Sequence, residues 1–139
     1  MNKIRKMIKN ERGMTLIELL AVIVIIAIIA AIAIPAIGNI ITNQKEKAIL
    51  ADASTILSGA KLAFADGACG TDNSCSNIEL AGFIDELKTP LVEGDKVDKT
   101  TSGYDITYSA LGQINNAKYK EGITGNKISS DKLNKNMGN

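Results

Sequence analysis

An uninterrupted apolar run near the N-terminus constrains this chain more than any other feature. The 19 residues of segment 19–37 include no charged side chain and none that forms hydrogen bonds. As an α-helix such a run is roughly 28 Å long, close to the roughly 30 Å hydrocarbon core of a bilayer. We therefore expect one membrane-spanning helix, followed by a separate compact part.

The charges on either side of this run predict its orientation. Residues 1–12 carry five basic side chains against a single acid, Glu11. An excess of basic residues before a membrane span places the N-terminus in the cytoplasm. Everything from about residue 38 onward is then expected outside the membrane, where roughly 100 residues can bury only a small core.

The composition argues against an enzyme. The chain has no histidine and only two cysteines. It therefore lacks the commonest general base and the usual zinc ligand sets. No serine or threonine lies in a recognisable nucleophile motif, and no glycine-rich phosphate loop stands out. We expect no catalytic residue, no metal site and no cofactor.

An ordinary secretory signal peptide is the alternative interpretation of a basic segment followed by an apolar one. The tripeptide Ala31-Ile32-Ala33 fits the small-residue pattern of its cleavage site. The apolar run is longer than the usual 7–15 or so residues of such signals. The helical pattern also continues past the end of the apolar run, which favours a helix that is retained.

Helical periodicity persists beyond Gly38. Apolar and small residues spaced mostly three and four apart form one stripe: Ile41, Ile49, Ala53, Ile56, Ala60 and Phe64. Polar residues lie mainly off it: Lys45, Lys47, Asp52, Ser54, Ser58 and Lys61. Gly67 is placed to end the helix. We expect one continuous helix to about residue 65, with an amphipathic outer half.

A short second helix is predicted over residues 76–89. Ser76 and Glu79 have capping-box spacing, and Pro90 stops the helix. Its predicted apolar stripe comprises Ile78, Ala81, Ile84 and Leu87.

Beyond Pro90 the period changes to two. Tyr104, Ile106 and Tyr108 fall on one face of a strand bounded by Gly103 and Gly112. Residues 91–99 and 114–120 are the expected partner strands of a small antiparallel sheet. The stretch from Glu121 is rich in Asn, Lys, Ser and Gly and is expected to fray.

The two cysteines, Cys69 and Cys75, enclose a short polar loop. Outside the membrane a disulfide is their natural pairing, and free thiols are the alternative. Asp66, Asp72 and Asn73 lie around this loop, but they lack EF-hand spacing. A turn-rich polar loop explains them better than a calcium site does.

Charge in the part after the span is uneven. Residues 66–98 carry eight acids against two lysines, and residues 115–139 carry five lysines against two acids. This uneven distribution of charge favours electrostatic contacts between subunits of a filament, or a mild attraction of the basic C-terminal residues to DNA or anionic wall polymers. Solvation of the surface is the simplest explanation of the same pattern.

Residues 12–35, RGMTLIELLAVIVIIAIIAAIAIP, resemble the N-terminal signature of type IV prepilins and type II secretion pseudopilins. In that family a dedicated peptidase cuts after a glycine that ends a basic leader, and the new N-terminus is usually methylated. The resemblance implies that Gly13 ends the leader and that Met14 is the mature, N-methylated residue. Glu18 and Pro35 match the family's acid and helix proline. The first mature residue is most often Phe, so Met14 departs from the pattern.

Glu18 is the one acid within this segment, and it lies near the cytoplasmic end. Cleavage would expose a positive amine on Met14, one helical turn before Glu18. Inside a bundle of apolar helices, that amine of one subunit can pair with Glu18 of another, and only in the correct register. A snorkelling acid that complements the helix dipole is the alternative.

Other residues of the span suit packing against copies of the same helix. Ala27 and Ala31 form a small-xxx-small pair, which permits close approach of two helices. Pro35 removes a backbone hydrogen bond to Ala31 and favours a kink.

The resemblance implies an α+β, pilin-like fold in which a long N-terminal helix packs on a small antiparallel sheet. It divides the chain into a cleaved leader (1–13), a transmembrane and polymerisation helix (14–37) and an extracytoplasmic head (38–139). It implies a structural subunit of a type IV pilus or a related surface filament. The alternatives are a pseudopilin for DNA uptake or secretion, and a membrane-anchored binding module that never polymerises.

The same resemblance implies the partners. These are further copies of the chain and other pilins, a prepilin peptidase, an assembly platform with its ATPase, and membrane lipid before assembly. Before assembly the chain is expected to be a single-pass membrane protein with its N-terminus in the cytoplasm. After assembly it is expected to be part of an extracellular surface filament.

Overall fold

The fold is a long N-terminal helix followed by a small sheet with short helices around it. The computed structural model describes the backbone of residues 2–138 and the side chains of residues 15–138. The elements in chain order are α1 (Asn2–Asp66), β1 (Ser74–Ser76), α2 (Asn77–Leu80), β2 (Lys96–Thr100), β3 (Gly103–Thr107), the 3-10 helix η1 (Ser109–Gln113), α3 (Ala117–Lys120), β4 (Lys127–Ser129) and α4 (Ser130–Asn136). The expected α+β class is confirmed.

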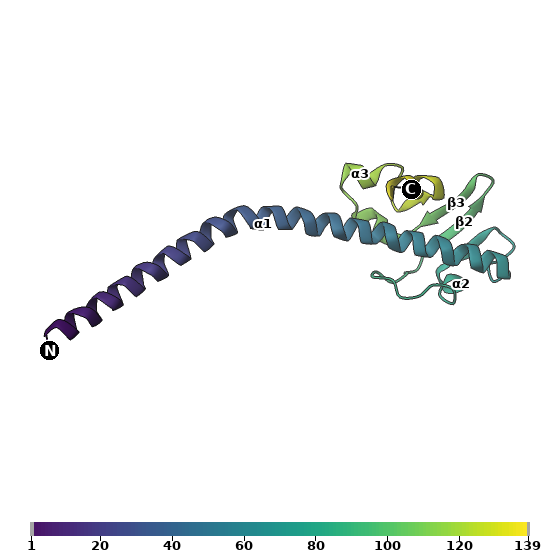
Figure 1. Cartoon of the computed structure of the whole chain (residues 1–139). Coiled ribbons are helices and arrows are strands. Elements are labelled where there is room, and N and C mark those ends of the chain that lie inside the picture. Colours follow the sequence, from purple (N-terminus) through teal and green to yellow (C-terminus); the bar gives the residue numbers. More distant parts are fainter. Residues whose placement is uncertain (1, 139) are drawn as a thin grey trace. The chain divides into compact units, whose positions relative to one another are not determined.

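The chain divides into two units, Met1–Ile41 and Thr42–Asn139. The first unit consists of the early part of α1. The second unit contains the rest of α1 and every strand, and all of the buried apolar core falls between Ile49 and Leu133. The second unit therefore has a complete core of its own. Within it, α3 and the C-terminal end lie on one side of α1 and α2 lies on the other (Figure 1).

The end of α1 is determined by Gly67, as the sequence predicted. This glycine has a φ of +74°, a left-handed conformation that residues with a Cβ rarely adopt. The backbone N–H of Ala68 donates to the carbonyl oxygen of Ala63 over 2.9 Å and caps the last turn.

The outer half of α1 packs through the predicted apolar stripe. Ala53, Ile56 and Ala60 are at most 1% exposed and form part of the core. Ile41 is different, because it belongs to the first unit and is 49% exposed. The buried stripe therefore begins later than predicted, near Ile49.

The sheet is antiparallel throughout, in the order β1-β2-β3-β4. One row of side chains crosses all four strands in register, Cys75, Val97, Ile106 and Ile128. Each of these residues is at most 1% exposed. Alternation along each strand places the row on a single face of the sheet, which packs in the same core as α1.

The second helix is much shorter than predicted. Its start is confirmed, because Ser76 and Glu79 form the expected capping box. The helix ends at Leu80, far before Pro90, so the predicted stripe is wrong. Leu80 is fully buried, whereas Ile78 is 80% exposed.

Close packing against α1 accounts for the irregular backbone after α2. A Cβ on Gly59 would lie 2.8 Å from the carbonyl oxygen of Phe83 and 2.5 Å from a side-chain carbon of Ile84. The loop approaches α1 closely at Gly59, a helical position where no side chain obstructs the contact.

The predicted strand pairing is correct on one side of the central strand and wrong on the other. β2 (Lys96–Thr100) overlaps the predicted partner strand 91–99 and extends one residue beyond it. Residues 114–116 have an irregular backbone and residues 117–120 form α3, so this segment is not a strand. The second partner of β3 is β4, in the stretch that was expected to fray.

That C-terminal stretch is ordered because it supplies core residues. Ile128 of β4 and Leu133 of α4 are at most 1% exposed. Ser129 caps α4, since its side-chain oxygen accepts a hydrogen bond from the N–H of Lys132. The side-chain amide of Asn136 donates to the carbonyl oxygens of Tyr119 and Glu121. The prediction of a frayed tail is therefore wrong.

Cys69 and Cys75 form the predicted disulfide, which links the end of α1 to β1. Both are nearly or fully buried.

We expect a fragment of residues 38–139 to be soluble and monomeric at micromolar concentration, because it lacks the apolar span. Reduction should raise its intact mass by two hydrogens and lower its free energy of unfolding by about 2 kcal/mol. An unchanged mass on reduction would contradict the bond.

Candidate functional site

The candidate processing and assembly residues all lie in the first unit, within α1. Gly13 and Met14 are helical, and the side chain of Met14 lies outside the described part of the chain. Glu18, Ala27 and Ala31 are exposed on the helix. Their predicted roles in cleavage, methylation and assembly stay predictions, since they concern other molecules.

The described side chains of the first unit, residues 15–41, present a largely apolar surface. Sixteen large apolar side chains between Leu16 and Ile41 are at least 49% exposed. A helix that is apolar around its whole circumference requires lipid or other helices as its surroundings. Within the described residues, one helical stretch, Thr15–Asp66, is long and apolar enough to cross a membrane.

Several alanines lie close together along the same part of α1. Ala27 and Ala31 are four apart and therefore share a face. Ala30 and Ala33 are less exposed than their neighbours because longer side chains flank them. The helix continues through Pro35, so this residue does not terminate α1. The predicted kink there stays a prediction.

Comparison with known protein families identifies this segment. The prokaryotic N-terminal methylation motif matches residues 8–34. The chain carries the type IV pilin and pseudopilin signature. The match covers less than a quarter of the chain and includes Gly13, Met14 and Glu18. Searches of curated proteins and of solved structures found no match.

The pilin signature has two general implications. It implies processing by a peptidase and polymerisation with other pilins. Together with the apolar part of α1, it is consistent with a membrane-anchored protein that later becomes exposed at the surface.

The second unit contains three buried acids, Glu46, Asp52 and Asp95, each at most 9% exposed. Sequence analysis placed Asp52 among the polar residues off the buried stripe and did not single out Glu46 or Asp95. Glu46 accepts hydrogen bonds from the backbone N–H groups of Asn115, over 2.9 Å, and Asn116. Asp95 accepts from the N–H groups of Val92 and Ser109, both over 2.9 Å.

These carboxylates hold loops whose backbone groups have no partner in the sheet. Buried N–H groups without acceptors are costly, so each acid stabilises the loop that it contacts. A signal for Glu46 was present in the sequence. It precedes Ile49 by three residues and therefore falls on the buried stripe of α1.

Asp52 belongs to a polar cluster with Tyr108 and Thr89. The Tyr108 hydroxyl donates to the carbonyl oxygen of Thr89 over 2.6 Å, and Oδ2 of Asp52 lies 3.4 Å from the same hydroxyl oxygen. The N–H of Thr89 donates to Asp52. Burial and the Asp52 carboxylate raise the pKa of Tyr108 to about 12.

The raised pKa of Tyr108 predicts a loss of stability in alkali. The folded protein holds the neutral phenol, whereas the unfolded chain releases the proton near its ordinary pKa of 10.0. Stability from this group is therefore complete below pH 10 and should fall as the pH rises towards about 12. Urea unfolding of the 38–139 fragment across this range measures the effect.

A Tyr108→Phe fragment is the matched control for this titration. It lacks the phenol and should show a shallower alkaline decline, although it is less stable near neutral pH because the Thr89 carbonyl loses its donor. Equal slopes for the two proteins would contradict the assignment.

Metal binding finds no support in the part of the chain from Thr15 to Gly138. There, no three or more His, Cys, Asp or Glu residues gather in a group that could hold a metal ion. The buried acids Glu46, Asp52 and Asp95 instead accept hydrogen bonds from backbone N–H groups.

Proposed function

We propose that this chain is a structural subunit of a type IV pilus or pilus-like surface filament, matured by a prepilin peptidase and polymerised through its N-terminal helix. The observation that supports this most is the coincidence of the methylation motif at residues 8–34 with the exposed apolar side chains that α1 carries from Leu16 to Ile41. A lipid anchor alone would need the apolar surface but not the motif.

In this proposal, Glu18 sets the register between subunits. Cleavage after Gly13 leaves a positive amine on Met14, one turn from Glu18. While the subunit waits in the membrane, Glu18 lies near the cytoplasmic edge, where burial of its charge is less costly. In the filament, the amine of one subunit neutralises Glu18 of another, and a misregistered subunit leaves both charges buried and unpaired.

We assign this chain a structural role and no catalytic one. The partners are other pilins, the prepilin peptidase, and an assembly platform with its ATPase. Before assembly the N-terminus faces the cytoplasm, in keeping with the basic residues 1–12. After assembly the second unit faces the outside of the cell.

The N-terminus of the mature protein tests the processing step. Mass analysis of the protein from its native membrane should find Met14 as the first residue, carrying one added methyl group. The basic leader cannot enter the bilayer, so its removal precedes assembly. A protein that begins just after Ala33 would indicate signal peptidase and would contradict the proposal.

The location of the mature protein separates the two kinds of filament. A pilus subunit should appear in the fraction sheared from the cell surface. A processed chain that stays with the cell envelope would favour a pseudopilin of a DNA-uptake or secretion apparatus.

A further inference from the structure

The second unit exposes few large apolar side chains, and two of them line hollows whose charged residues have opposite sign. In the described part of this unit, the large apolar residues with substantial exposure are Leu62, Ile78, Val92 and Met137. Ile78 lines a groove of about 680 Å³, and Met137 lines a hollow of about 330 Å³. Exposed apolar residues gathered at concave sites are typical of interaction surfaces.

The groove lies between α2 and the irregular loop that follows it. Its apolar lining includes Ile84, Leu87 and Pro90 in addition to Ile78. The charged residues that line it are both acids, Asp85 and Glu86, and both are exposed. We call this surface the acidic groove.

The hollow lies between α1, α3 and the end of α4. Leu50, Tyr119 and Met137 form its apolar lining. The charged residues that line it are both lysines, Lys47 and Lys118. We call this surface the basic hollow.

Three lysines in the C-terminal part of the unit are engaged within the chain. Lys132 and Lys135 pair with Glu121, and Lys127 pairs with Asp105. The hydrogen bond from Lys135 lowers the pKa of Glu121. Among residues 15–138 no ion pair of Lys47 or Lys118 was found, and the Lys118 ammonium lies 5.7 Å from the centroid of the Tyr119 ring.

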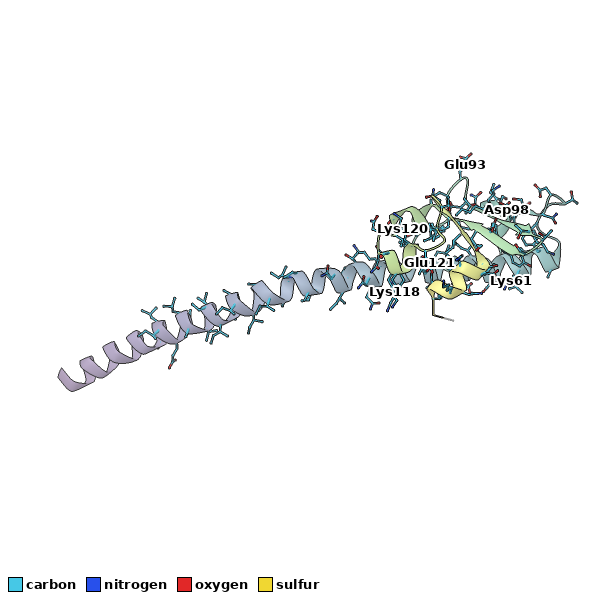
Figure 2. The ribbon with its side chains drawn as sticks, turned by 90° about the horizontal axis from the view of Figure 1, so that it is seen from above. Lys61, Glu93, Asp98, Lys118, Lys120 and Glu121 are labelled. Carbon is cyan, nitrogen blue, oxygen red and sulfur yellow. A yellow bond between two sulfur atoms is a disulfide. The ribbon has the colours of Figure 1, made fainter. Side chains whose placement is uncertain are left out.

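The acidic groove and the basic hollow lie on different sides of α1. Figure 1 places α2 on one side of this helix and α3 with the C-terminal end on the other. Figure 2 shows Lys118 and Lys120 on opposite sides of the ribbon in that view, while Glu93 projects from the upper edge of the unit. Two complementary surfaces that do not coincide produce a heterologous contact, which extends into a chain of subunits and does not stop at a dimer.

We propose that the acidic groove of one copy faces the basic hollow of the next copy, with the exposed side chains of Ile78 and Met137 at the contact and Glu86 opposite Lys118. Opposite charges around apolar centres favour this pairing and oppose groove-to-groove or hollow-to-hollow contacts. The inference rests on the proposed filament function and adds a contact between second units to the contact between N-terminal helices.

Chemical cross-linking of filaments tests the direction of this contact. Full-length chains with Ile78→Cys, Met137→Cys or both are expressed in cells, and surface filaments are treated with a short bismaleimide. The native cysteines are joined in a disulfide, so only the introduced thiols react. We expect a ladder of oligomers from the double variant and single chains from each single variant.

Mixing the two single variants in one cell adds a second measurement. A heterologous contact then yields cross-linked dimers, since each chain has only one reactive surface. Dimers from filaments of one single variant alone would mean an isologous contact and would overturn the proposal. Filaments of the double variant without any cross-link would also overturn it.

Charge reversal tests the contact without introduced thiols. Glu86→Lys or Lys118→Glu should lower the filament yield about fivefold, because each change replaces an attraction by a repulsion. The two changes together should restore most of the yield. Glu93→Lys and Lys120→Glu are matched controls, being the same substitutions at exposed positions outside the two surfaces.

The outcomes of this test separate the two proposals. A wild-type chain that is processed but never forms filaments would contradict the proposed function. Wild-type filaments with equal losses from Glu86→Lys and Glu93→Lys, or no recovery in the doubly reversed chain, would contradict only the contact between second units.

Discussion

Glu18→Ala should abolish surface filaments or reduce them sharply while leaving cleavage after Gly13 largely intact. The peptidase acts at the junction and on the apolar segment beside it, and alanine preserves both. Membrane insertion should survive and can improve, because the substitution removes a charge from the apolar part of α1. The defect is therefore expected at assembly and not before it.

The expected size of this effect follows from burial of an unpaired charge. Without Glu18, the amine of each incoming subunit would enter an apolar bundle with no counter-charge. Leaving one member of a buried pair unpaired costs on the order of 3 kcal/mol, and the penalty recurs at every subunit added. Glu18→Asp should rescue poorly, since its carboxylate is one methylene closer to the backbone.

Glu11→Ala is the matched control for this experiment. It is the same substitution, but Glu11 lies in the predicted leader and should be absent from the filament. Sheared surface fractions from cells that express wild-type, Glu18→Ala or Glu11→Ala chains measure filament, and mass analysis of the membrane fraction measures cleavage. Wild-type filament abundance in the Glu18→Ala chain would refute the register role and favour a plain membrane anchor.

Leu133→Ala should destabilise the second unit by about 2–5 kcal/mol, the range expected for truncation of a fully buried leucine. Leu133 is 0% exposed and packs with Ile128 and Tyr108 in the core of the unit. A domain of this size has a total stability of about 5–15 kcal/mol, so the substitution removes a large fraction of it. Urea unfolding of the 38–139 fragment measures the change.

Asn134→Ala is the control for this prediction, because Asn134 is the next residue in α4 and is exposed. Its effect should stay within about 0.5 kcal/mol, as for most surface substitutions. If Leu133→Ala were equally mild, the C-terminal stretch would not belong to the core.

Several features of the fold could be predicted from the sequence because local chemistry determines them. The apolar run and the small residues around Ala53 and Ala60 specify one long helix, and Gly67 ends it through a left-handed backbone that other residues avoid. The capping box of Ser76 and Glu79 is likewise a contact between near neighbours. In the strand around Ile106, alternation alone identifies the buried face.

The features that sequence analysis missed depend on partners far along the chain. The second helix stops at Leu80, because the following loop packs against Gly59 of α1. The polar C-terminal stretch contains few apolar residues, yet Ile128 completes the sheet and Leu133 completes the core. Neither contact leaves a periodic signal in so short a segment.

The residues of the candidate functional surfaces also fall into two groups, those that local sequence identifies and those that distant contacts bring together. The proposed roles of Gly13, Met14 and Glu18 depend on their spacing on one helix, so this part of the candidate site could be recognised from the sequence by itself. Only the tertiary structure assembled the acidic groove and brought Lys47 of α1 beside Lys118 of α3. The physical reason is that helical spacing is set by nearby residues, whereas a surface is set by which distant segments share a core.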